Sequence, residues 1–184
     1  YKLMRIWTLN GQTKDAFTKS QAGGWKYDVL FAGLKVNMPD LCASLGLGQI
    51  RKYHELMNER KRVAVQYETF FSQKEWAKCP ILKDEKRISC NHLYALRINN
   101  ISEEQRDRMI DEITQAGVSV NVHFIPMPML TVFKGMGYNI LDYPKAFDNY
   151  SREISLPIYP QLTLEQVDYI CQSVLNAYKK VVND

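Results

Sequence analysis

The sequence lacks the features that would place it in a membrane or send it out of the cell. It has no run of about 18 apolar residues, so we expect no membrane-spanning helix. No basic, apolar and small-residue signal peptide opens the chain. A strong excess of one charge is missing too. The chain has 24 Lys and Arg against 20 Asp and Glu, and a formal net charge of +4 does not by itself indicate a nucleic-acid partner.

Paired cysteine motifs are also absent. None of the four cysteines belongs to a C-x-x-C pair: they are Cys42, Cys79, Cys90 and Cys171. Cys90 and His92 lie close in sequence, but a zinc site needs about four ligands and no second pair supplies them. We therefore expect no metal site. We interpret the cysteines as free thiols in a reducing compartment, which predicts a cytoplasmic protein.

What the chain does have is enough apolar sequence for a core. Hydrophobic residues make up 46% of its 184 residues, which suits one domain, or one small domain with part of another. Residues 1–10 predict the end of a helix, broken at Asn10-Gly11. A chain that opens inside such an element predicts a fragment of a longer protein. The polar residues 12–24, with the pair Gly23-Gly24, predict a loop, and alternation over 25–31 predicts a short strand.

A long helix is predicted from Pro39 to Phe70-Phe71, because proline suits the first helical position and Asp40 suits the positive end of the helix dipole. The helix is basic, with Arg51-Lys52 and the run 60–62. Such residues can form a nucleic-acid or membrane stripe. They are distributed around the helix, however, so we interpret them as a solvated face on a helix that links two domains.

The C-terminal half predicts a small sheet flanked by helices. Residues 92–98 predict a strand, Ser102 and Gln105 form a capping box that opens a helix ending at Gly117, and 118–122 predict a second strand. Together these elements predict a βαβ-like unit. Further along, the predicted elements are helical turns at 131–136, a short helix at 144–150, an edge strand at 154–158, and a capping box at Thr163 and Gln166 before an amphipathic last helix.

One stretch looks like a site. Residues 32–50 combine a glycine turn, Lys35 and Asn37, and the start of the long helix. Lys35 and Asn37 are two residues apart, so in an extended segment their side chains point to the same side. A simpler alternative is that Asn37 only caps the helix.

Three stretches in the right order carry a resemblance: residues 32–50 (AGLKVNMPDLCASLGLGQI), 117–126 (GVSVNVHFIP) and 155–163 (SLPIYPQLT). They resemble the second half of the DegT/DnrJ/StrS-type sugar aminotransferases. The resemblance implies an α/β protein of the aspartate-aminotransferase fold, fold type I, that uses pyridoxal 5'-phosphate (PLP). It also implies a domain division: a remnant of the large PLP-binding domain at 1–38, a connecting helix at 39–73, and the C-terminal small domain at 74–184.

The resemblance also implies roles for named residues. Lys35 and Asn37, where the family often has Asn and Arg, are expected to reach the cofactor phosphate of the neighbouring subunit. A lone histidine is usually a structural hydrogen-bonding residue. The resemblance instead implies that His123, Phe124, Ile125 and Pro126 line a nucleotide-sugar cleft. The lysine that forms the Schiff base lies upstream in the family, so we expect no catalytic residue in this chain.

The implied parent is a homodimer whose active site is shared across the interface. It transfers an amino group, expected to come from glutamate, to a keto group on a nucleotide-linked sugar in amino-sugar or surface polysaccharide biosynthesis. We expect this chain alone to be inactive. The alternative is a regulatory or interaction domain without catalytic function, with DNA as a candidate ligand of the basic helix at 51–62.

Overall fold

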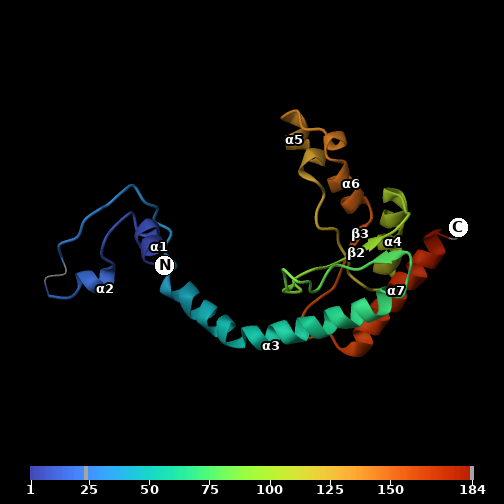
Figure 1. Ribbon diagram of the computed structural model, residues 1–184, viewed down its shortest axis with the longest axis horizontal. Helices are drawn as coiled ribbons and strands as arrows, with labels where there is room; N and C mark the ends of the chain where they lie inside the picture. The colour runs from blue at the N-terminus through green and yellow to red at the C-terminus, as the bar shows by residue number, and fades with distance from the viewer. Residues whose placement is uncertain (23–24, 183–184) are drawn as a thin grey trace. The chain divides into compact units, whose positions relative to one another are not determined.

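The computed structural model describes residues 1–22 and 25–182. The loop predicted at 12–24 contains a short helix at Ala16–Lys19, and its Gly23-Gly24 pair lies outside the described residues. The chain divides into two compact units, Tyr1–Lys52 and Tyr53–Asp184, and each is described by itself (Figure 1). In the described part of the chain, every helix is either too short or too polar to cross a membrane.

The N-terminal unit contains α1 (Lys2–Thr8), α2 (Ala16–Lys19) and the first turns of α3 (Asp40–Phe71). The predicted helix break at Asn10-Gly11 is confirmed, since both residues have a positive φ, 58° and 73°. Glycine is required at position 11, because a Cβ on Gly11 would lie 2.0 Å from the carbonyl oxygen of Phe31. The break therefore turns the chain after α1.

The predicted strand at 25–31 is wrong. Only Val29 forms a β-bridge, to Gln12. Side-chain oxygens take the backbone N–H groups that a ladder would use: Thr13 accepts from the N–H of Asp28, and Asp28 accepts from the N–H of Val29. Such local acceptors compete with strand pairing.

The predicted long helix is confirmed as α3, which begins at Asp40, and the Pro39 carbonyl accepts a hydrogen bond from Ala43. Its buried residues all lie near its C-terminal end: Val63, Ala64, Tyr67 and Phe71. The apolar residues near its start are exposed: Leu41, Leu45, Leu47 and Ile50. No described atom beyond the helix backbone approaches within 4 Å of a Cβ built on Gly46 or Gly48.

The sheet belongs to the C-terminal unit and has three strands in the order β1-β2-β3. β1 (Ala77–Lys78), β2 (Tyr94–Ile98) and β3 (Glu153–Leu156) pair antiparallel. The strand predicted at 92–98 is thus confirmed as β2. The predicted edge strand is confirmed as β3 and ends before Pro157. β1 was not predicted, because its two residues are too few to show alternation.

The predicted strand at 118–122, and with it the βαβ-like unit, is wrong. Only Asn121 pairs with β3, through a bridge to Ser155. The Asn121 side chain accepts from the N–H of Val122, and the Glu153 side chain accepts from the N–H of His123. The next two N–H groups thus go to side chains, and the ladder stops after one residue.

Both predicted capping boxes are confirmed. Ser102 and Gln105 exchange hydrogen bonds at the start of α4 (Glu103–Gln115), and Thr163 and Gln166 do the same before α7 (Leu164–Val182). Helix α4 is followed by Gly117 at φ 80°. Both helices therefore begin at the position that their capping boxes predict.

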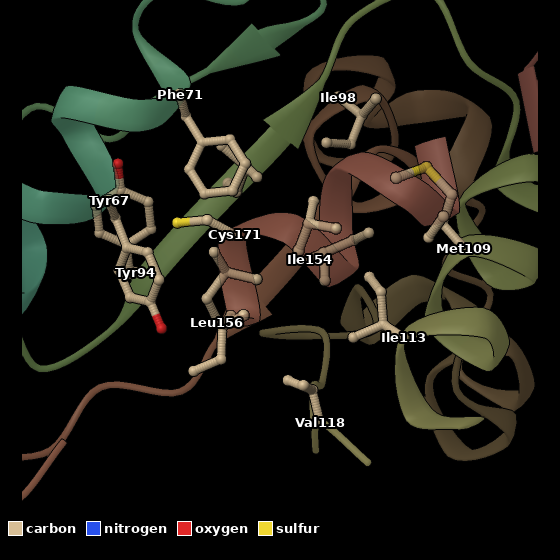
Figure 2. Packing of buried hydrophobic residues seen from close by; sticks show 14 of the residues in the cluster. Tyr67, Phe71, Tyr94, Ile98, Met109, Ile113, Val118, Ile154, Leu156 and Cys171 are labelled. Carbon is tan, nitrogen blue, oxygen red and sulfur yellow. The ribbon is translucent and has the colours of Figure 1, made fainter. Parts of the chain in front are cut away.

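One face of the sheet carries the core (Figure 2). Leu96 from β2 and Ile154 from β3 are fully buried against the end of α3, against Met109 and Ile113 of α4, and against α7. Burying one such aliphatic side chain contributes about 1.5–3 kcal/mol. The core helices α3, α4 and α7 pack on this face, whereas residues of α6 (Pro144–Ser151) lie beside the polar side chains of the other face.

Between Pro126 and β3 the chain forms four short helices. The helical turns predicted at 131–136 are confirmed as α5 (Thr131–Gly135), and the short helix predicted at 144–150 is confirmed as α6 (Pro144–Ser151). The two 3-10 helices are η1 (Met127–Met129) and η2 (Ile140–Asp142). Helix α6 leads directly into β3, so its end lies close to the polar residues of that strand.

Candidate functional site

The N-terminal unit brings Lys35 and Asn37 together. The segment is extended because the N–H of Leu34 donates to Trp7 (2.8 Å) and the N–H of Val36 donates to Thr8 (2.9 Å). The Lys35 Nζ then donates to the Asn37 Oδ1 at 2.6 Å. The prediction that the two side chains point to the same side is therefore confirmed. The α3 helix begins three residues beyond Asn37, so Asn37 is not its N-cap.

These two side chains fit part of a phosphate site. After the bond to Asn37, the Lys35 ammonium keeps two further N–H donors, and the Asn37 amide keeps its NH₂ group. Both residues are exposed. A point charge beside an amide donor suits a phosphate oxygen. The geometry of this pair is thus compatible with the phosphate group of PLP.

The C-terminal unit holds the second predicted set in a pocket of about 400 Å³. His123, Phe124 and Pro126 line it, whereas Ile125 does not. The Phe124 ring is 73% exposed, so it presents a free aromatic face at this pocket. The pocket and the Lys35–Asn37 pair belong to different units.

The wall of this pocket is the second face of the sheet. Ala95 pairs with Ser155 and Arg97 pairs with Glu153 across β2 and β3, so all four side chains lie on the face opposite the core. Ala95, Arg97 and Glu153 line the pocket, and Arg97 donates to the Asn149 side chain from α6. Alternation along two strands therefore separates a polar face from the apolar core.

A chain of hydrogen bonds ties His123 to this face. The Glu153 carboxylate is 5% exposed and accepts from the His123 backbone N–H at 2.9 Å. It also accepts from the Ser155 hydroxyl, whose oxygen lies 2.8 Å from the His123 Nδ1. Buried carboxylates need such partners. The His123 backbone and ring are thus both fixed to one buried acid.

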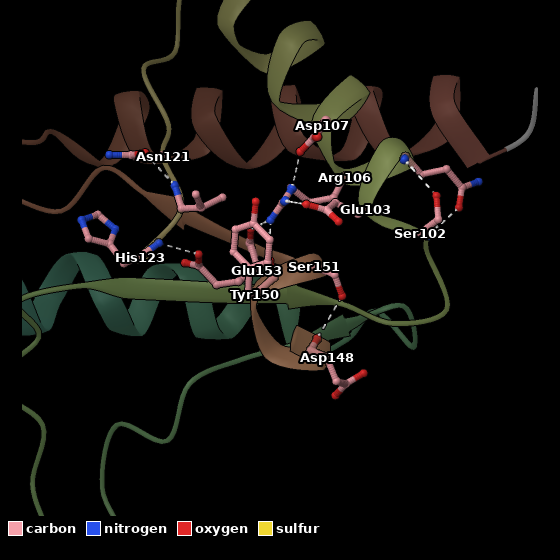
Figure 3. A network of polar contacts seen from close by, with 12 residues as sticks. Ser102, Glu103, Arg106, Asp107, Asn121, His123, Asp148, Tyr150, Ser151 and Glu153 are labelled. Carbon is pink, nitrogen blue, oxygen red and sulfur yellow. Dashed lines mark hydrogen bonds and ion pairs between the residues drawn. The ribbon is translucent and has the colours of Figure 1, made fainter. Parts of the chain in front are cut away.

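Arg106 binds two residues that line the pocket, Tyr150 and Glu153 (Figure 3). Its side chain is 1% exposed, donates to the carbonyls of Tyr150 and Glu153, and forms an ion pair with Asp107 at 2.7 Å. Its guanidinium carbon lies 4.7 Å from the centre of the Tyr150 ring. Burial, and then a hydrogen bond to Glu103, raises the pKa of the Tyr150 phenol, so it stays protonated.

The sequence predictions did not include Glu153, Ser155, Arg97 or Arg106. Two local signals could have found them. Glu153 and Ser155 alternate with apolar residues in a strand, which places both on one face. Arg106 precedes Met109 and Ile113 at helical spacing, on the buried side of its helix.

Two other features that the sequence raised are a metal site and the basic helix. Within the described ranges, no group of three His, Cys, Asp or Glu side chains is placed to hold a metal ion. On the basic helix, Arg62 binds Glu59 and the Leu162 carbonyl, and Arg60 contacts the His92 ring. The predicted solvated face thus holds for Arg51, Lys52 and Lys61, which are exposed, whereas Arg60 and Arg62 are half-buried.

Comparison with known proteins gives a consistent result. The model of the DegT/DnrJ/EryC1/StrS aminotransferase family matches residues 2–175. The spore coat polysaccharide biosynthesis protein SpsC of Bacillus subtilis is 33% identical over 180 residues, which cover 96% of this chain and 46% of SpsC. The UDP-4-amino-4,6-dideoxy-N-acetyl-beta-L-altrosamine transaminase of Helicobacter pylori is 26% identical and covers 97% of this chain and 45% of its own length.

Solved structures are similar as well. A Streptococcus pneumoniae protein in its PMP form, described as a sugar aminotransferase, is 39% identical with a TM-score of 0.85 and covers 98% of this chain and 45% of that structure. Helicobacter pylori PseC, an aminotransferase of pseudoaminic acid biosynthesis, is 26% identical with a TM-score of 0.76 over 96% of this chain and 45% of its own. The expected α/β fold is confirmed. This chain spans just under half the length of the relatives it matches.

Proposed function

Because this chain belongs to the DegT/DnrJ/EryC1/StrS aminotransferase family, we propose that it is the C-terminal part of a PLP-dependent aminotransferase acting on a nucleotide-linked keto sugar. The observation that carries the proposal is the family match over residues 2–175, which includes both candidate sites. Proteins of this family are PLP-dependent sugar aminotransferases. When bound, PLP supplies the electron sink for amino transfer.

Lys35 and Asn37 have the role of holding the cofactor phosphate. Their paired donors support this role, because an ammonium and an amide can each bind a phosphate oxygen. In the proposed homodimer, the phosphate they reach belongs to the neighbouring subunit. The amino donor in our proposal is glutamate.

The pocket beside His123 has the role of binding the sugar. The exposed Phe124 ring offers an apolar surface for one sugar face, and Arg97 offers N–H donors for its oxygens. Pro126 and Pro80 add rigid apolar contacts at the same pocket. Ile125 is 45% exposed outside the pocket lining, so its proposed contact with substrate is at the rim.

The chain alone is inactive in this proposal, because its residues supply phosphate and sugar contacts but no assigned Schiff-base lysine. The test uses the intact parent protein. We expect it to show the absorbance of bound PLP and to consume glutamate in the presence of a nucleotide-linked keto sugar. The 184-residue chain is the matched comparison and should do neither. A parent protein that binds no PLP would refute the proposed function.

A further inference from the structure

We infer that Glu153 and Ser155 are positioning residues that hold His123 in its Nδ1–H tautomer. The His123 Nε2 then faces the pocket as a hydrogen-bond acceptor for a hydroxyl or ammonium group of the bound sugar. The identity of that ligand rests on the proposed function. The tautomer does not, because it follows from a count of protons in the network.

The count starts at the buried carboxylate. An ionised carboxylate can only accept hydrogen bonds, and Glu153 accepts two: from the His123 backbone N–H at 2.9 Å and from the Ser155 hydroxyl. The Ser155 hydroxyl has one hydrogen, and Glu153 takes it. At 2.8 Å from the His123 Nδ1, the Ser155 oxygen can therefore only accept. The proton of that bond must be on Nδ1.

The hydrogen bonds of Glu153 match the ionised form that this count requires. Its two carboxylate oxygens meet two donors, the His123 backbone N–H and the Ser155 hydroxyl. Protonated Glu153 would reverse the chain, with Ser155 donating to Nδ1, so the tautomer reports which form is present.

The Nε2 edge of the His123 ring is the part that is free to bind the ligand. With Nδ1 bound to Ser155, Nε2 carries a lone pair, and no residue in the described ranges hydrogen-bonds to it. His123 lines the same pocket as Arg97, so the pocket offers both an acceptor and donors. Hydroxyl groups of a sugar need both kinds of partner. The opposite tautomer would offer a second donor, and the O–H of the ligand would lose its acceptor.

The test is NMR of the ring nitrogens in the ¹⁵N-labelled 184-residue chain, at a pH about two units above the ordinary histidine pKa of about 6.5. The wild-type His123 is expected to give the pattern of the Nδ1–H tautomer. The chain has three histidines. The signals of His54 and His92 therefore serve as internal references when a substitution at Glu153 or Ser155 changes the signals of His123.

Glu153→Gln should reverse the tautomer. Its amide oxygen would still accept from the His123 N–H, but its NH₂ would donate to Ser155, which must then donate to Nδ1. Ser155→Ala should abolish the preference for Nδ1–H by removing the acceptor. Glu75→Gln and Ser72→Ala are the matched controls, because both residues are exposed and neither side chain is part of the network. They should leave the His123 signals unchanged.

A wild-type His123 in the Nε2–H form would overturn the inference, and so would a folded Glu153→Gln variant that keeps Nδ1–H. The wild-type measurement needs no variant, so it decides even if Glu153→Gln fails to fold. The experiment contains no PLP and no sugar. Failure of the aminotransferase assay on the parent protein would therefore leave this result intact, and the reverse also holds.

Discussion

At the residue scale, two basic side chains of the candidate sites, the exposed Lys35 and the buried Arg106, have different roles. Lys35 is exposed and is joined to Asn37 by one hydrogen bond, which leaves its charge available. Arg106 is buried and has partners on α4, α6 and β3. The first residue is suited to binding an anion, and the second to holding the pocket together.

Replacing Lys35 by Met removes the charge while keeping the length of the side chain. In the parent protein we expect the affinity for PLP to fall about 10-fold, since hydrogen bonds to charged groups contribute about 1.5–3 kcal/mol. A titration followed by PLP absorbance measures the change. Lys52→Met, also exposed and in the same unit, is the control. Equal affinities for the two variants would contradict the phosphate role.

Replacing Arg106 by Ala should destabilise the C-terminal unit by about 3–5 kcal/mol, because buried partners of the guanidinium would lose their donor. The carbonyls of Tyr150 and Glu153 would be left without it. Urea unfolding followed by circular dichroism gives the free energy of unfolding. Arg108→Ala, on the exposed side of the same helix, should change it by less than about 0.5 kcal/mol. Similar losses for both variants would mean that burial of Arg106 has no energetic role.

At the element scale, helix starts could be predicted from the sequence and strand pairing could not. A capping box depends on two residues three apart, so Ser102 with Gln105 was visible in the sequence. Pairing depends on which acceptor each N–H finds. The N–H groups of Val29 and Val122 find side-chain oxygens, and both predicted strands failed there. No periodic pattern marks β1, which has only two residues.

The difference between local and long-range contacts also explains which parts of the candidate sites could be predicted. Lys35 and Asn37 were identified because a period of two is local. The hydrogen bonds of His123 were not, because Glu153 and Ser155 are 30 and 32 residues further along the chain. Only the folded sheet brings them together.

Ser102→Ala tests a helix start and should cost about 1 kcal/mol at neutral pH. The Ser102 hydroxyl is the main cause of the lowered pKa of Glu104. That carboxylate therefore stabilises the folded state above the ordinary pKa of 4.5, and its contribution is lost as the pH falls through the lower folded-state pKa. We expect the difference between variant and wild type to shrink below that pH.

Urea unfolding at neutral and acidic pH measures the Ser102→Ala effect, and ¹³C NMR of the Glu104 carboxyl should show its pKa rising in the variant. Ser72→Ala, an exposed serine with no capping role, is the control. A pH-independent difference would show that Glu104 is not coupled to the cap.

At the scale of the whole molecule, α3 belongs to both units, and its burial is uneven. Its buried residues begin at Val63, and from there it shares the core of the C-terminal unit. Its first turns expose Leu41, Leu45 and Ile50. A helix of a few turns without tertiary packing is only marginally stable in water. In this 184-residue chain, the two ends of one continuous helix should therefore differ in local stability.

Brief trypsin treatment of the folded chain should therefore cut first at Arg51 or Lys52 or nearer the N-terminus, because local opening is easiest where few apolar contacts hold the backbone. Further along α3, the Arg62 guanidinium is bound to the Leu162 carbonyl at 2.7 Å, which joins the helix to the segment before α7. A fragment that begins at Tyr53 should accumulate in mass spectra and keep its circular dichroism. The urea-unfolded chain, cut at sites throughout, is the control. First cuts inside α4 or α7 would place the weakest region in the C-terminal unit, against the distribution of buried residues.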